Sequence, residues 1–99
     1  MAVYSGTKGA LDRLTCAFAA ELGPPCIRVN TLVPGGTHCG MDRKRGLHRR
    51  PVEDEMVSRT PLARLGQPSD RAKAVAILAS DDALWITGDR IVALPGSYG

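Results

Sequence analysis

The sequence predicts an α/β fold in which two helices alternate with two parallel strands. Apolar residues recur at three- and four-residue steps in residues 4–22 and again in residues 69–79, as in amphipathic helices. Two short runs that contain β-branched residues, 27–33 and 90–94, predict strands. Because a helix joins these two runs, the strands should pair in parallel within one sheet.

The first helix carries an apolar stripe with alanines between its members. The stripe consists of Leu11, Leu14, Phe18 and Leu22. Small residues beside such a stripe let another helix approach closely. Gly23 and the two prolines after it should end the helix, because glycine suits a helix cap and proline cannot continue the hydrogen-bond ladder.

The strand at 27–33 stops at Pro34-Gly35-Gly36 and reads as one that is covered on both faces. From Thr37 to Pro61 the periodicity fails, and one or two helical turns are expected only around residues 53–58. A loop this long in a compact unit is typically a lid, a binding loop or a disordered segment. In the second helix we expect Ser69 as the N-cap and Asp70 near the positive end of the dipole.

Composition limits the classes of protein that are possible. The 99 residues suffice for one small domain at most, and 43% hydrophobic with 23% charged residues is ordinary for a globular chain. No run approaches the ~20 apolar residues of a membrane span, and no leader resembles a signal peptide. Cys16, Cys26 and Cys39 lack metal-ligand spacing, so we expect no metal site and thiols in a reducing cytoplasm.

The net charge of +3 comes mainly from a basic run between Arg43 and Arg50. Such a run can meet phosphates or an acidic partner. No aromatic platform or nucleic-acid-binding motif accompanies it, so a solvated loop is favoured and no nucleic-acid partner is expected.

Tyr4 and Lys8 are the candidate chemical pair. Four residues apart on a helix, their side chains share one face. An ammonium beside a phenol favours the phenolate, so the hydroxyl can exchange a proton with a carbonyl or alcohol oxygen. By spacing alone, a half-buried tyrosine and a solvated lysine on a surface helix are the favoured interpretation, because this pair is common by accident.

The order of several short motifs separates these readings. The motifs are Tyr4-Ser5-Gly6-Thr7-Lys8, Ile27-Arg28-Val29-Asn30, Pro34-Gly35, Pro61-Leu62-Ala63-Arg64-Leu65-Gly66-Gln67-Pro68 and Ile86-Thr87-Gly88. Together they closely resemble the C-terminal part of the short-chain dehydrogenase/reductase family, over nearly all of the chain except about 42–57. The resemblance implies the C-terminal portion of a Rossmann-like, doubly wound parallel sheet. Residues 1–99 would then form a single partial domain without the N-terminal nucleotide-binding half.

The resemblance also implies roles for individual residues. Tyr4 matches the family's catalytic general acid and base, and Lys8 matches the lysine that lowers the pKa of that tyrosine and binds the nicotinamide ribose. Pro34, Gly35 and Thr37 match the segment that contacts the nicotinamide. NAD or NADP is the implied cofactor, and a small-molecule carbonyl or alcohol is the implied substrate. The helix that carries Tyr4 resembles one that packs across a subunit interface, so a homo-oligomer or association with a related subunit is expected.

Two classes of function remain open at this level. One is a NAD(P)-dependent oxidoreductase; the other is an inactive, truncated remnant or interaction fragment that binds a related full-length subunit. The sequence departs from the family at Cys39, where a threonine usually helps to hold the cofactor and a thiol is a weaker partner. It has no residues that select between NAD and NADP, and its loop does not identify the substrate.

Overall fold

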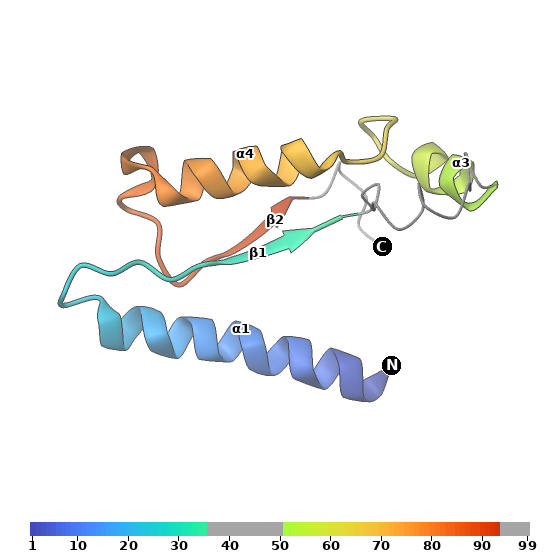
Figure 1. The fold of residues 1–99 in the computed structure, drawn as a ribbon. Coiled ribbons are helices and arrows are strands. Elements are labelled where there is room, and N and C mark those ends of the chain that lie inside the picture. Colours follow the sequence, from blue (N-terminus) through green and yellow to red (C-terminus); the bar gives the residue numbers. More distant parts are fainter. Residues whose placement is uncertain (36–50, 94–99) are drawn as a thin grey trace. The chain divides into compact units, whose positions relative to one another are not determined.

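The computed structural model describes residues 1–35 and 51–93, without the side chains of 51–53. Figure 1 shows the order of the elements along the chain. They are helix α1 (Ala2–Leu22), strand β1 (Thr31–Pro34), helix α3 (Pro51–Ser58), helix α4 (Pro68–Ala79), a 3-10 turn (Asp81–Ala83) and strand β2 (Arg90–Ala93). Both amphipathic helices and the helical turns expected around 53–58 are confirmed.

The strands β1 and β2 pair in a two-stranded sheet and run parallel, as predicted. Three backbone hydrogen bonds at the two ends of the ladder show the parallel direction, because the residue numbers of the bonded partners rise together on both strands. The donor amides and acceptor carbonyls are Gly88 to Val29 at 2.7 Å, Thr31 to Asp89 at 2.9 Å and Gly35 to Ala93 at 3.1 Å. The chain packs as two compact units, Met1–Leu32 with Ala76–Ile91 and Val33–Val75 with Val92–Gly99. That residues 1–99 act as one partial domain stays a prediction.

The predicted bounds of the first strand are wrong at its start. Regular pairing begins at Thr31 rather than at residue 27, and Thr31 to Val33 are half-buried. The residues before it use their polar groups in other ways. The Val29 amide donates to the Thr87 hydroxyl at 3.1 Å, and the Asn30 side chain bonds to residues 86 and 89. Side-chain hydrogen bonds therefore supplement the one backbone bond, from the Gly88 amide to the Val29 carbonyl, over these residues.

Helix α1 ends at Leu22 as expected, but its glycine does not take the left-handed conformation. Gly23 stays right-handed, with φ of −59°, and Cys26 has a φ of 63° instead. The Ile27 amide donates to the Leu22 carbonyl at 3.0 Å and the Cys26 amide to the Gly23 carbonyl at 2.8 Å, the pair of bonds in a Schellman motif. Both prolines accept the φ of a last helical turn, so the chain reverses only at Cys26.

The face that α1 buries is narrow and contains small side chains. Thr15 and Ala19 are buried, and the Thr15 and Thr31 hydroxyls share a hydrogen bond of 2.7 Å that joins α1 to β1. The members of the apolar stripe Leu11, Leu14 and Phe18 are 50%, 51% and 47% exposed. Among the described residues, the only buried apolar side chains are Ala19 and Ala83. The stripe is therefore only partly covered within the described part of the chain.

Helix α4 begins at Pro68, two residues earlier than an N-cap at Ser69 predicts, so Gln67 and not Ser69 precedes the first helical residue. Proline is favoured at the first helical position because it has no amide to leave unpaired. The Asp70 carboxylate accepts the Gln67 amide at 2.7 Å and two bonds from Arg64, at 2.7 and 3.1 Å. The Arg64 hydrogen bonds, followed by that of Gln67, lower the pKa of Asp70 from 3.8 to about 2. The expected position of Asp70 in the first turn of α4 is confirmed.

Within 1–35 and 51–93, no helix combines the length and the apolar character needed to cross a membrane.

Candidate active site

The structure brings Tyr4 and Lys8 together on the first turns of α1. The Lys8 ammonium nitrogen lies 5.5 Å from the centre of the Tyr4 ring, within the range of a cation–π contact. Both side chains are exposed, and Tyr4 is 60% exposed. The phenol hydroxyl and the ammonium are therefore both open to a ligand that approaches this face of the helix.

The helix that carries this pair is regular at its start. The Ser5 amide donates to the Met1 carbonyl at 2.9 Å, and the Thr7 hydroxyl donates to the Tyr4 carbonyl at 2.8 Å. This local bonding fixes the backbone between Tyr4 and Lys8, so the four-residue spacing is kept as a single turn.

Pro34 and Gly35 lie at the carboxyl end of β1. Ligands of open parallel sheets bind beyond the carboxyl ends of the strands. Pro34 is exposed, and Gly35 is half-buried and donates its amide to the Ala93 carbonyl. Tyr4 and Lys8 belong to the first compact unit, whereas Pro34 and Gly35 belong to the second. Thr37 and Cys39 lie outside the described residues.

Two polar residues at 28 and 30 have roles that the sequence reasoning missed. The Arg28 guanidinium donates to the carbonyls of Ile86 at 3.4 Å and Ser80 at 3.2 Å. The Asn30 amide donates to the same Ile86 carbonyl at 2.9 Å, and its oxygen accepts the Asp89 amide at 3.1 Å. The only signal in the sequence was the presence of arginine and asparagine inside an otherwise β-branched run. These bonds hold the segment before β2 against the segment before β1.

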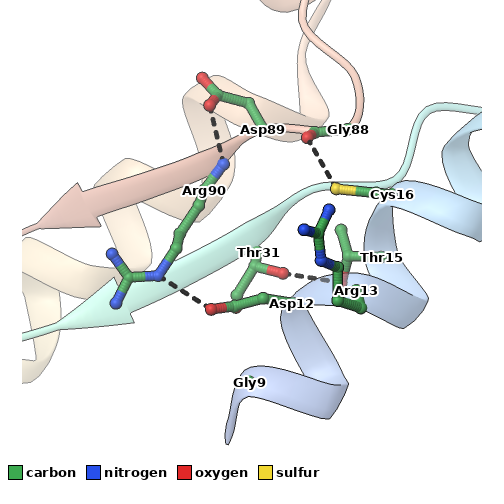
Figure 2. A pocket seen from close by; sticks show the side chains of 9 residues that line it. All are labelled: Gly9, Asp12, Arg13, Thr15, Cys16, Thr31, Gly88, Asp89 and Arg90. Atoms are coloured by element: carbon green, nitrogen blue, oxygen red, sulfur yellow. Dashed lines mark hydrogen bonds and ion pairs between the residues drawn. The ribbon is translucent and has the colours of Figure 1, made fainter.

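A cavity of about 360 Å³ lies between α1 and the starts of the two strands (Figure 2). Gly9, Asp12, Arg13, Thr15 and Cys16 line it from the helix.

From the strands, Thr31 and residues 88–90 complete the lining of this cavity. Neither Tyr4 nor Lys8 contributes to it. The cavity is therefore a separate feature of the first compact unit.

No group of three histidine, cysteine, aspartate or glutamate side chains among the described residues is placed to hold a metal ion.

Comparison with known proteins decides the family. A family model described as Enoyl-(Acyl carrier protein) reductase matches residues 1–96. The chain belongs to the short-chain dehydrogenase/reductase family. A relative from Claviceps purpurea, named as a short chain dehydrogenase, is 37% identical over 103 residues. The match covers 95% of this chain and 39% of that protein. The predicted family is thus confirmed.

Two further relatives are named as an oxidoreductase and as a reductase. An uncharacterized oxidoreductase of Methylorubrum extorquens is 49% identical over 100 residues, covering 96% of this chain and 38% of that protein. An acetoacetyl-CoA reductase of Rhizobium meliloti is 37% identical over 95 residues, covering 96% of this chain and 39% of that protein.

Solved structures agree on the fold. A 3-oxoacyl-[acyl-carrier protein] reductase of Brucella melitensis superposes with a TM-score of 0.83 at 38% identity, covering 97% of this chain and 35% of that one. An oxidoreductase of the same family from Burkholderia thailandensis gives 0.82 at 29% identity, covering 94% of this chain and 37% of that one. The chain thus spans less than two fifths of the length of these short-chain dehydrogenase/reductase proteins. The predicted fold, a portion of a Rossmann-like parallel sheet, is confirmed.

Proposed function

We propose that this chain is the C-terminal part of a NAD(P)-dependent oxidoreductase that interconverts a carbonyl and an alcohol. The observation that carries the proposal is the Lys8 ammonium at 5.5 Å from the Tyr4 ring, with both side chains exposed at the start of α1. The names of the relatives support the reaction class, since the Rhizobium and Brucella proteins are both described as reductases of oxoacyl compounds.

In this proposal Tyr4 moves the proton. Its hydroxyl donates to the carbonyl oxygen during reduction and accepts a proton from the alcohol during oxidation. The Lys8 charge stabilises the phenolate that proton donation leaves behind. Exposure of both side chains allows the substrate oxygen to reach the hydroxyl directly.

On the family pattern, the chemistry of these residues suits a nicotinamide cofactor, which would supply or accept the hydride. Lys8 offers three N–H donors and no acceptor, which suits the hydroxyls of a ribose. Pro34 and Gly35 stand at the carboxyl end of a parallel strand, where such ligands bind. We assign cofactor binding to Tyr4, Lys8, Pro34, Gly35 and Thr37 on the family pattern, and the choice between NAD and NADP stays open.

A chimeric enzyme tests the proposal. Residues 1–99 would replace the matching 35% of the Brucella reductase, and turnover of a 3-oxoacyl substrate would be followed through the absorbance of NADH or NADPH. Tyr4→Phe should lower turnover roughly 10²–10⁴-fold with cofactor affinity nearly unchanged, because only the proton-donating hydroxyl is removed. Lys8→Met should reduce both turnover and cofactor affinity.

Two substitutions serve as matched controls, namely Tyr98→Phe at the other tyrosine of the sequence and Lys73→Met on α4. Both should keep the activity of the chimera. Retention of most activity in Tyr4→Phe would show that the catalytic assignment is wrong.

A second candidate function is an interaction fragment that binds a related full-length subunit or another copy of itself. The half-exposed stripe of Leu11, Leu14 and Phe18 supports it, together with a core whose buried apolar side chains, in the described residues, are two alanines. An inactive chimera whose α1 still drives association would favour this candidate over the enzyme.

A further inference from the structure

The cavity between α1 and the starts of the strands has the size of a small-ligand site. Pockets for small molecules span roughly 300–1,000 Å³, and this one measures about 360 Å³. Its base is fixed by the hydrogen bond between the Thr15 and Thr31 hydroxyls, at 2.7 Å. The Cys16 thiol donates to the Gly88 carbonyl at 3.6 Å on one side (Figure 2). Both walls are thus held in place by bonds that cross from the helix to the strands.

The charged groups that line the cavity differ in whether they are paired. Asp12 accepts a hydrogen bond and ion pair from Arg90 at 3.1 Å. The Asp89 carboxylate accepts the Arg90 amide at 2.8 Å. For Arg13, no ion pair or hydrogen bond joins its guanidinium to any described residue. Arg13 is therefore the one charged group of this lining, within residues 1–35 and 51–93, whose donors are unused.

We propose that this cavity binds a small molecule that carries a phosphate or carboxylate group, with the oxyanion held by Arg13. A guanidinium presents five N–H donors in a planar fork that matches both of these groups. On the opposite wall the Asp12–Arg90 ion pair is neutral and the Asp89 carboxylate keeps its negative charge, so the attraction for an oxyanion comes from Arg13 alone. This inference is independent of the proposed oxidoreductase function, because Tyr4 and Lys8 do not line the cavity.

Gly9 provides a way to close the cavity without disturbing the helix. A Cβ atom built on Gly9 meets no atom within 4 Å, and the same is true of Gly6, which does not line the cavity. Leucine is favoured over glycine inside a helix. Gly9→Leu should therefore fill the cavity while α1 remains folded, and Gly6→Leu is its matched control.

The reactivity of two exposed thiols can show whether the cavity is occupied. Cys16 lines the cavity and Cys26 does not. Alkylation of each thiol by iodoacetamide would be followed in the 99-residue chain by peptide mass spectrometry. The probes are inorganic phosphate and succinate, with the uncharged succinamide as control and potassium chloride added to equalise ionic strength.

Phosphate or succinate should slow alkylation of Cys16 and leave Cys26 unchanged. At three times its Kd, a probe leaves about one quarter of the sites free, so the rate should fall about fourfold. Arg13→Gln should weaken binding by about tenfold or more, since hydrogen bonds to charged groups are lost. Gly9→Leu should remove the protection, whereas Gly6→Leu and the charge control Lys73→Gln should keep it.

Protection by phosphate alone, by succinate alone or by both would support the proposal and identify the preferred oxyanion. Equal effects on Cys16 and Cys26, protection that survives Arg13→Gln, protection by succinamide, or no protection at all would overturn it. None of these outcomes depends on nicotinamide binding or turnover, so failure here leaves the proposed function to its own test.

Discussion

Replacing Leu11, Leu14 and Phe18 by glutamine should prevent self-association of the chain while leaving α1 intact. Glutamine is nearly as favourable in a helix as leucine. The three side chains are about half exposed and lie outside the buried face at Thr15 and Ala19. Their substitution therefore changes the partly exposed surface of the helix and keeps the hydrogen bond from Thr15 to Thr31 that joins it to β1.

The free energy of self-association can be worked out from the exposed fractions of these side chains. Full burial of a leucine or phenylalanine side chain is worth about 1.5–3 kcal/mol, so covering the exposed half of each adds roughly 1 kcal/mol. Val3 extends the stripe and is 82% exposed, which adds about 2 kcal/mol. A two-fold contact between copies would then gain ~10 kcal/mol. After an association cost of at least ~4 kcal/mol, the remaining ~6 kcal/mol corresponds to a Kd of tens of micromolar.

Sedimentation equilibrium would measure this association at concentrations from about one tenth of that Kd to about ten times it. The parent should rise above its monomer mass of 10.5 kDa. The triple variant should remain monomeric, because the loss of ~6 kcal/mol in the pair cancels the net gain. Ala20→Gln is the control, since Ala20 is exposed on the side of the helix opposite the stripe.

The reasoning would be refuted by a parent chain that stays monomeric at every concentration and melts in one sharp transition followed by circular dichroism. That result would mean that these residues close a stable core by themselves. Equal association of the parent and the triple variant would place the interface elsewhere.

Three further predictions concern single groups and the cofactor. Cys26→Gly should slow amide hydrogen exchange at Ile27 about fivefold, because it removes roughly 1 kcal/mol of left-handed strain, and faster exchange would contradict this. An NMR titration of Asp70 should have its midpoint at about 2, and Arg64→Met should move it toward 3.8. Because folding lowers this pKa, the stabilisation by Asp70 is complete above pH 3.8 and is lost as the pH falls through about 2. The 99-residue chain alone should bind NADH and NADPH more weakly than micromolar by calorimetry, since it has no G-x-G-x-x-G phosphate-binding turn.

Features that depend on neighbours in the sequence could be predicted from the sequence. The repeat of apolar residues predicted helices α1 and α4, and the β-branched runs predicted the bounds of the two strands to within a few residues. The four-residue spacing of Tyr4 and Lys8 gave their contact, because one turn of helix brings such side chains together. The parallel pairing followed from the helix that joins the strands.

The tertiary structure decided which groups meet across the chain. In the structure the buried face of α1 contains Thr15 and Ala19 and not the apolar stripe. The side chains of Arg28 and Asn30 donate to carbonyls more than fifty positions away. At the end of α1 the tertiary structure also put the left-handed conformation on Cys26 and not on Gly23. Periodicity in a sequence reports the polarity of each helix face, whereas burial depends on the segment that packs there. Partners such as Asn30 and Ile86 are brought together by the sheet, and local spacing contains no record of that pairing.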